Sequence, residues 1–147
     1  MELAVTNLKK YYDGRAVLDG LSFTAPVGLT RIVGDSGIGK TTLLRILLGL
    51  ERADGGTVAP QGLRWAAVFQ EDRLLSQLDA EGNLRFALGT AYDSRKAAEL
   101  LETLGLVDVG GKRVRDYSGG MKRRLALARA LLAPCDALAL DEPFTGL

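Results

Sequence analysis

The stretch GDSGIGKT, residues 34–41, decides the fold of this chain. It fits the pattern G-x-x-x-x-G-K-[ST], whose glycines let the backbone turn tightly and direct successive N–H groups at phosphate oxygens. A short β-rich segment, LTRIVG (29–34), precedes it, and apolar residues at helical spacing follow it from Lys40 to Leu50. A strand, a glycine-rich loop and a helix in this order predict a phosphate-binding loop.

This loop supplies most of the predicted nucleotide contacts. Lys40 would reach the β- and γ-phosphates, and the Thr41 hydroxyl would ligate magnesium. The helix that begins near Lys40 adds the positive end of its dipole. The predicted ATP-binding residues of the loop are Gly34, Asp35, Ser36, Gly37, Ile38, Gly39, Lys40, Thr41 and Thr42.

Two acids come directly after a later apolar strand, ALAL (137–140). Asp141, at the exit of the strand, is predicted to hold magnesium through its water shell. Glu142 is placed to polarise the attacking water, as a general base or as a positioner. Taken alone, the same residues would be interpreted as a strand that ends in two solvated carboxylates. The predicted phosphate-binding loop upstream makes the catalytic interpretation the favoured one.

Composition narrows the class of protein. A chain of 147 residues with 47% apolar and 25% charged residues is typical of one α/β domain. The lone Cys135 excludes an internal disulfide, and the absence of histidine excludes a Ser-His-Asp triad. A formal charge of +1 gives no electrostatic argument for nucleic acid. No apolar run approaches the roughly 20 residues of a membrane span, and the N-terminus lacks a signal-peptide pattern.

The remaining strands and helices are predicted from the periodicity of apolar residues and from the turn and capping residues between them. Strands are expected at ELAVTNL (2–8), AVLDGLSF (16–23), within DGGTVAP (54–60) and at RWAAVFQ (64–70). Helices are expected at DAEGNLRFALG (79–89), DSRKAAELLETLGL (93–106) and SGGMKRRLALARALLA (118–133). The N-cap of the second helix is Asp93 or Ser94, with Gly105 as its C-cap. Residues 76–117 therefore form a helical insertion. Arg123 and Arg124 are interpreted as a solvated helix face without a role.

The segment YSGGMKRR (117–124) suggests a second anion site. Ser118 and two glycines at a helix start can bind an anion without a lysine. One interpretation is structural, with Ser118 as an N-cap and the glycines allowing close backbone approach. Because the chain has only one nucleotide-sized phosphate loop, the other interpretation is that this helix start serves the nucleotide of another subunit.

The order of phosphate loop, glutamine after a strand, SGG segment and LALDEP resembles the nucleotide-binding domain of an ATP-binding cassette (ABC) transporter. The resemblance covers the whole chain. It implies a P-loop NTPase fold of class α/β, with a RecA-like core sheet, an N-terminal antiparallel β subdomain and a helical insertion. It also implies a head-to-tail dimer in which Ser118, Gly119, Gly120 and Met121 contact the ATP of the partner. Met121 stands where the family usually has glutamine, and Tyr117 where it usually has leucine.

Two further residues take their expected roles from this resemblance. Gln70 resembles the glutamine that senses magnesium and the γ-phosphate and that joins the core to the helical subdomain. Its other interpretation is an ordinary loop glutamine. Tyr12 resembles the aromatic residue that stacks on adenine, a contact for which a ring face is suited. Tyr11 is the competing residue, and Tyr12 is favoured because it directly precedes the turn.

The resemblance also implies a domain longer than these 147 residues. Family domains continue into an aspartate, a strand and a switch histidine, and that strand lies between the phosphate-loop strand and the LALDE strand. We therefore expect the chain to be the N-terminal part of a longer ATPase, truncated after the strand that bears Asp141, and to hydrolyse ATP slowly or not at all. The alternative is a natural short form that binds ATP without efficient turnover.

The expected protein is the ATPase subunit of a transporter, with ATP and Mg²⁺ as ligands. Residues 1–75 and 134–147 would form the core and about 76–133 the helical subdomain. The expected partners are a membrane permease, a second ATPase subunit and, in an importer, a solute-binding protein, at the cytoplasmic face of the membrane. VFQEDRLL and SGGM are similar to importers of nitrate, sulfonates and taurine. Alternatives are a non-transport cassette ATPase, a P-loop kinase or GTPase, and a module that only binds ATP.

Overall fold

The computed structural model describes residues 2–107 and 109–143. The chain forms two compact units, Met1–Leu63 and Arg64–Leu147. The expected core, residues 1–75 with 134–147, draws on both units, and that division into core and helical subdomain stays a prediction.

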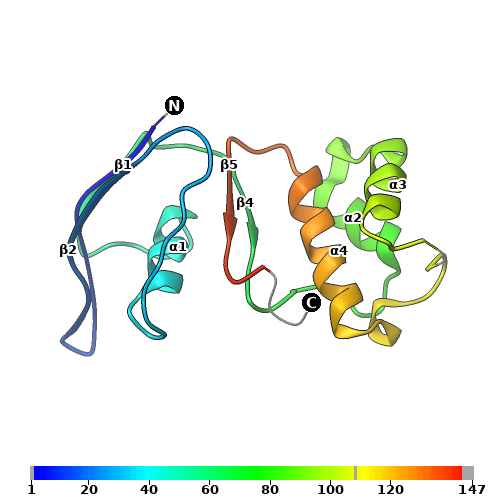
Figure 1. The fold of residues 1–147 in the computed structure, drawn as a ribbon, viewed down its shortest axis with the longest axis horizontal. Helices are drawn as coiled ribbons and strands as arrows, with labels where there is room; N and C mark the ends of the chain where they lie inside the picture. The colour runs from blue at the N-terminus through cyan, green and yellow to red at the C-terminus, as the bar shows by residue number, and fades with distance from the viewer. Residues whose placement is uncertain (1, 108, 144–147) are drawn as a thin grey trace. The chain divides into compact units, whose positions relative to one another are not determined.

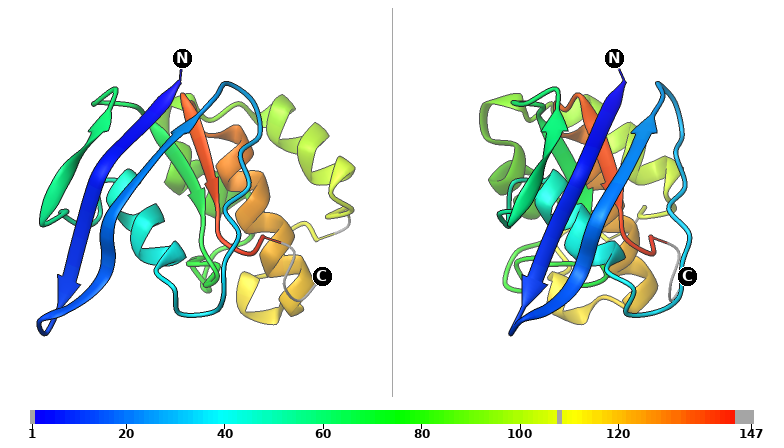
Figure 2. Two further views of the ribbon diagram at one scale, coloured as in Figure 1. Left: turned by 60° about the vertical axis from the view of Figure 1, so that its left-hand side comes forward. Right: turned by 90° about the vertical axis from the view of Figure 1, so that its left-hand side faces the viewer.

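The first unit contains a three-stranded antiparallel sheet in the order β2-β1-β3. Its strands are β1 (Leu3–Tyr12), β2 (Arg15–Ala25) and β3 (Gly55–Ala59), and α1 (Lys40–Leu47) lies on one face of the sheet (Figure 2). The two expected N-terminal strands are confirmed and pair as an antiparallel hairpin, with Asp13 and Gly14 at positive φ in its turn. The buried side chains are Val5, Leu8, Leu18, Leu43, Ile46 and Leu47. The three from α1 recur at helical spacing and so give this helix one apolar face.

The predicted strand at residues 29–34 is wrong, because this segment has no strand conformation. Leu29 is 95% exposed and Val33 is 77% exposed. A strand depends on a neighbour for its backbone hydrogen bonds, and the paired strands among the described residues are β1 with β2 and β3, and β4 with β5. Residues 29–34 are apolar enough to form a strand. None of the strand pairs in the described part of the chain includes them, however, so they have no neighbouring strand there that would stabilise this conformation.

The second unit is built around one long helix. The strands β4 (Trp65–Val68) and β5 (Ala137–Leu140) are parallel, with Trp65 opposite Ala137 and Val68 opposite Leu140. The helix α4 (Gly119–Leu132) packs against β4 on one side and against α2 (Ala80–Leu88) and α3 (Ser94–Thr103) on the other (Figure 1). Short 3₁₀ turns lie at Gly89–Ala91 and Val114–Asp116.

Two apolar clusters explain this arrangement. Leu84, Leu125 and Ala128 belong to the larger one, between α2 and α4, and all three are fully buried. Ala66, Val68 and Ala130 form the smaller one, between β4 and α4. Small residues such as Ala128 and Ala130 let α4 approach its neighbours on both sides. The predicted strands and helices of this unit are thereby confirmed.

Local capping sets the helix starts. The side chain of Asp79 accepts from the Gly82 amide at 2.7 Å, and the side chain of Asp93 accepts from the amides of Arg95 and Lys96. The N-cap of α3 is therefore Asp93, which decides between the two residues that the sequence left open. At its other end Leu104 is the C-cap and Gly105 follows with φ +65°.

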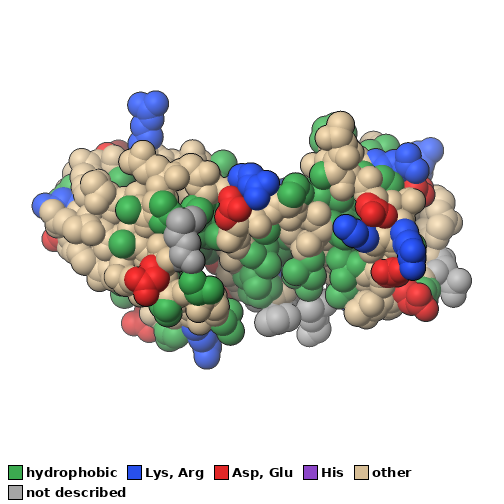
Figure 3. Space-filling view, turned by 90° about the horizontal axis from the view of Figure 1, so that it is seen from above, with side chains coloured by type: hydrophobic (Ala, Val, Ile, Leu, Met, Phe, Trp, Pro, Cys, Tyr) green, Lys and Arg blue, Asp and Glu red, His purple; other side chains and the backbone are tan. Residues whose placement is uncertain are grey.

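The exposed faces of α2 and α3 carry paired charges. Glu81 and Arg85 are 2.7 Å apart, and Arg95 and Glu99 are 3.2 Å apart, each pair at i,i+4 spacing. On the face shown in Figure 3, acidic and basic side chains correspondingly lie side by side. Exposed pairs of this kind contribute little to stability because water screens them, so they favour the helices without fixing the fold.

Candidate functional site

The glycine-rich loop of the first unit leads directly into α1. Gly39 is the N-cap of this helix, at φ +107°. A Cβ at this position would lie 3.0 Å from a Val17 methyl carbon and 3.1 Å from the Val17 carbonyl. Both the left-handed backbone and the contact with β2 therefore require glycine here. This close approach places the start of α1 against the sheet.

Lys40 is the first residue of α1, and its ammonium folds back over the loop. Its Nζ donates to the Gly34 carbonyl at 2.5 Å and to the Asp35 carbonyl at 2.8 Å. Both hydrogen bonds are exposed. The lysine thus lies where the loop begins and the helix starts, with its charge at the surface.

Tyr12 lies at the end of β1 beside α1. The Glu51 carboxylate, hydrogen-bonded to the Tyr12 hydroxyl, raises the pKa of Tyr12, and the Thr42 hydroxyl opposes this rise. The Lys10 ammonium lies 5.2 Å from the centroid of the Tyr12 ring. The structure therefore brings Tyr12 to Thr42, which is one of the predicted ATP-binding residues. Its stacking on adenine stays a prediction.

In the second unit, the predicted glutamine and acids lie at one edge of the β4–β5 pair. Gln70 follows β4 by two residues, and Asp141 directly follows β5. The Asp141 amide donates to the Val68 carbonyl at 2.8 Å, which continues the pairing beyond the strands. The carboxyl ends of parallel strands meet at the same edge, so Gln70, Asp141 and Glu142 come together there. Gln70 and Glu142 are both exposed.

Arg123 contradicts its interpretation as part of a solvated helix face. It is only 4% exposed, and its guanidinium binds backbone carbonyls that follow β4 and β5. Arg124 is half-buried, and its guanidinium donates to the carbonyls of Gly120 and Leu104. Sequence reasoning missed both because charged residues are almost never fully buried unless they are paired. The signal that could have found Arg123 is its spacing, since it lies three residues before Ala126 and seven before Ala130 on the apolar face.

Ser118 is the N-cap of α4, as its structural interpretation predicts. Its hydroxyl accepts from the Met121 amide at 3.2 Å. Gly119 and Gly120 form the first turn of the helix. Tyr117 is 5% exposed, and its hydroxyl makes no hydrogen bond of ordinary geometry in the described part of the chain. Burial raises the pKa of this hydroxyl, although the nearby Ala80 amide opposes the rise.

The predicted site residues fall into two groups that the structure brings together separately. Tyr12 and the residues from Gly34 to Thr42 lie in the first unit. The second unit holds the remaining ones, which are Gln70, Ser118, Gly119, Gly120, Met121, Asp141 and Glu142. Their roles toward a nucleotide stay predictions.

The donor set suits magnesium that arrives with a nucleotide. Mg²⁺ prefers oxygen ligands and is usually held by one or two protein side chains together with water and phosphate. Thr41, Gln70 and Asp141 offer such oxygens. Across residues 2–107 and 109–143, no group of three or more His, Cys, Asp or Glu could hold a metal ion by itself. Each unit thus offers oxygen atoms of the kind that this metal binds, and their joint binding of one ion stays a prediction.

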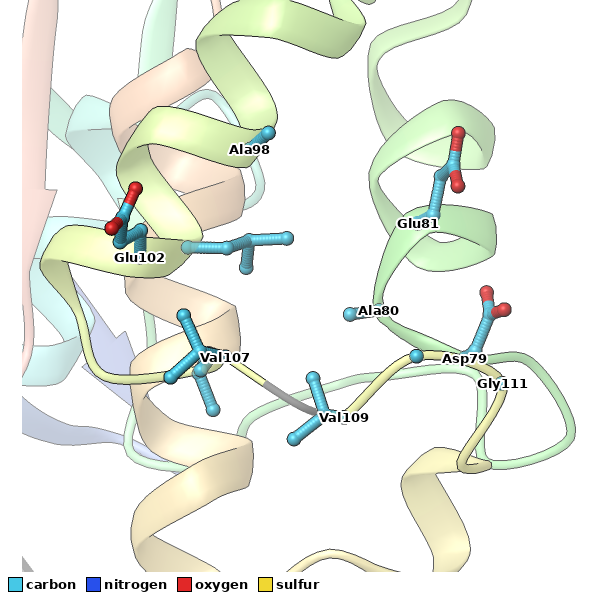
Figure 4. Close-up of a pocket in the computed structure, with 11 residues that line it drawn as sticks. Asp79, Ala80, Glu81, Ala98, Glu102, Val107, Val109 and Gly111 are labelled. Atoms are coloured by element: carbon cyan, nitrogen blue, oxygen red, sulfur yellow. The ribbon is translucent and has the colours of Figure 1, made fainter.

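A shallow hollow of about 270 Å³ lies between α2, α3 and the loop after α3. The side chains of Ala80, Val107 and Val109 face it, while Glu81 and Glu102 lie on opposite sides of it (Figure 4). No residue predicted for nucleotide binding lines it. No sequence pattern predicts this hollow, since its lining comes from segments that are separate along the chain.

A comparison with family profiles identifies the class of protein. The profile described as ABC transporter matches residues 18–145. This range includes the glycine-rich loop before α1, α4 with its SGG start, and the acids after β5. The chain belongs to the ABC transporter family.

Three similar proteins show the breadth of its relatives. The aliphatic sulfonates import ATP-binding protein SsuB 1 of Rhizobium johnstonii is 40% identical over 99% of this chain and 57% of its own length. The daunorubicin resistance ATP-binding protein DrrA3 of Streptomyces coeruleorubidus is 38% identical over 99% of this chain and 51% of its own. The sulfate/thiosulfate import ATP-binding protein CysA of Burkholderia mallei is 38% identical over 100% of this chain and 48% of its own. The chain thus spans about half the length of these relatives.

Proposed function

We propose that this chain is the nucleotide-binding part of a transporter ATPase, which binds ATP with Mg²⁺ and hydrolyses it to drive a solute through a membrane permease. The observation that carries the proposal is that two groups of candidate site residues lie within the one range that matches the ABC transporter family. A glycine-rich loop precedes α1, and two acids follow β5 beside the glutamine that follows β4. Each group has the chemistry that one half of a phosphate-transfer site requires.

The loop of the first unit would bind the phosphates. Loop amides and the N-terminus of α1 favour negative charge. The Lys40 ammonium would exchange its exposed carbonyl acceptors for phosphate oxygens, which are stronger acceptors because they are charged. The Tyr12 ring would stack on adenine at the end of β1.

The edge of the second unit would act on the attacking water. Glu142 would orient and polarise this water, and Gln70 would respond to the γ-phosphate. Thr41, Gln70 and Asp141 would hold magnesium, which supplies charge neutralisation to the phosphates when it is bound. The protein contribution is position, since phosphoryl transfer depends chiefly on alignment and electrostatic stabilisation.

The proposed assembly is a head-to-tail pair of ATPase subunits on a permease, at the cytoplasmic face of a membrane. Ser118, Gly119 and Gly120 would contact the nucleotide of the partner subunit through the start of α4. No helix in the described ranges is long and apolar enough to cross a membrane. The relatives include importers of sulfonates and sulfate and a daunorubicin resistance protein, so the proposal names neither a solute nor a direction.

Calorimetric titration of the chain with ATP tests the binding half of this proposal. We expect saturable binding of one ATP, strengthened by Mg²⁺, and weakened by the substitution Lys40→Ala but not by Lys112→Ala, which removes an exposed lysine elsewhere. Stronger binding of GTP than ATP, or no binding, would contradict it. Phosphate release that is abolished by Glu142→Gln with ATP binding retained supports the hydrolytic half, and transfer of phosphate to an acceptor other than water would contradict it.

A further inference from the structure

The buried guanidinium of Arg123 joins the two loops that carry the predicted reaction chemistry. Five of its contacts are made to backbone carbonyls, which are those of Phe69, Gln70, Asp141, Glu142 and Pro143. The sixth is the Asp72 carboxylate, 3.3 Å from Nη1. Phe69, Gln70 and Asp72 follow β4, whereas the other three residues follow β5.

Each nitrogen of the Arg123 guanidinium donates to different acceptors. Nε donates to the Pro143 carbonyl at 3.0 Å. Nη1 faces the loop after β4, and Nη2 donates to the carbonyls of Asp141 at 3.1 Å and Glu142 at 2.5 Å. A guanidinium is planar and its five N–H donors have fixed directions. It therefore fixes the two loops in position relative to each other.

The backbone at Glu142 shows why such a restraint matters. Glu142 has φ +48°, a left-handed conformation that is uncommon for a residue with a side chain. Strained backbone of this kind persists only where its surroundings determine it. The carbonyls on both sides of this residue and its own carbonyl are all acceptors of Arg123. The guanidinium thus stabilises the conformation that sets where the Glu142 carboxylate points.

Two other arginines on α4 provide a natural comparison. Arg129 donates to the carbonyls of Asp72 at 2.9 Å and Arg73 at 2.6 Å, so it contacts the loop after β4 alone. Arg124 donates to Gly120 and Leu104 and contacts neither loop. Of these three arginines, Arg123 is the one whose contacts span both loops.

We propose that Arg123 is a positioning residue for ATP hydrolysis, which holds Glu142 and the Gln70 loop in their relative places. It acts through backbone carbonyls and would not itself touch the nucleotide. This inference rests on the proposed function, because it assigns the reaction chemistry to those loops. It also predicts a larger effect on hydrolysis than on ATP binding, because most of the proposed phosphate contacts belong to residues 34–42, in the other unit.

Steady-state kinetics of ATP hydrolysis by the protein test the proposal. We expect Arg123→Gln to lower kcat on the order of 10²-fold, as misplacement by about 1 Å can do. KM for ATP should change much less, because the proposed phosphate contacts of residues 34–42 are retained. Arg123→Lys should lower kcat about 10-fold, since one ammonium with three donors cannot span both loops. Arg124→Gln is the matched control and should keep kcat within about twofold.

Hydrogen exchange provides a readout that needs no nucleotide. Arg123→Gln should speed amide exchange in residues 69–72 and 141–143 by about 10-fold or more beyond any increase in the rest of the second unit. Arg129→Gln should do so only near residues 72–73. If Arg123→Gln fails to fold, Arg123→Lys carries both measurements. Normal kcat in the foldable variant, or faster exchange spread evenly over the unit, would overturn the proposal. Absence of ATP binding and hydrolysis in the unsubstituted protein would instead overturn the proposed function.

Discussion

The glycine-rich loop before α1 and the loops after β4 and β5 use the same kind of contact in different settings. In each, a cation from a helix binds backbone carbonyls of a loop. Lys40 binds carbonyls five and six residues away, in exposed hydrogen bonds. Arg123 is buried and binds carbonyls 18 to 54 residues away. The Lys40 contacts are close in sequence and exposed, so a ligand could replace them. The Arg123 contacts join distant segments and are buried, so they restrain the tertiary structure.

Removal of the buried cation should have the largest effect. Arg123→Gln should lower the free energy of unfolding by about 3 kcal/mol, because it leaves buried acceptors and the Asp72 carboxylate without their charged partner. Urea denaturation followed by fluorescence of Trp65, the only tryptophan, reports on the second unit. Arg124→Gln, from the half-buried arginine, should cost about 1 kcal/mol or less. Equal losses in the two variants would remove the distinction between the buried and the half-buried arginine.

Removal of the exposed cation should affect the ligand rather than the fold. Lys40→Ala should weaken ATP binding about 10- to 100-fold, as loss of a charge-assisted contact of 1.5–3 kcal/mol implies. Its free energy of unfolding should stay within about 1 kcal/mol, since water replaces exposed hydrogen bonds. Titration calorimetry and urea denaturation measure the two quantities, with Lys112→Ala as control. A large loss of stability together with unchanged affinity would reverse the contrast.

The buried hydroxyl of Tyr117, which makes no hydrogen bond of ordinary geometry to the described residues, should behave differently from Arg123. Tyr117→Phe removes a hydroxyl that lies buried among apolar side chains of the larger cluster. We expect unchanged stability or a gain of up to about 1 kcal/mol, because no made hydrogen bond is lost. Tyr92→Phe is the control, because its hydroxyl donates to Glu81 at 3.1 Å. A loss above about 1 kcal/mol in Tyr117→Phe would indicate a partner for this hydroxyl.

The ion pair between Arg64 and Asp136, at the opposite end of β4 and β5, should make the smallest contribution to stability. This contribution should depend on pH. Asp136 precedes β5 and Arg64 precedes β4, and their charged groups are 2.9 Å apart at the surface. Hydrogen bonds from Arg64 lower the pKa of Asp136 from 3.8 to about 2. A lowered pKa in the folded state means that the contribution is present above pH 4 and is lost as the pH falls toward 2. Urea midpoints measured between pH 5 and 2 should show this loss, and Asp136→Asn should remove it.

These contrasts explain which features could be predicted from the sequence. Helix starts depend on a side chain and an amide two or three residues apart, so Ser118 was recognisable as a cap and Asp93 as one of two candidates. The meeting of Gln70 with the acids after β5 was predictable only through the family resemblance. The strand expected at residues 29–34 failed because composition records β propensity but not the presence of a partner. The environment of Arg123 was hidden because its acceptors are backbone atoms of distant segments.

The long sequence separations of the Arg123 contacts also set an order for folding during synthesis. Its acceptors after β4 are made before α4, but Pro143 lies 20 residues later in the chain. At a synthesis rate of about 5–20 residues per second, roughly 1–4 s pass between Arg123 and this last acceptor. During that interval the guanidinium lacks half of its hydrogen-bond partners, so its burial would be unfavourable. We therefore expect closure of the second unit around α4 to await the synthesis of β5, so that the two loops reach their final places together.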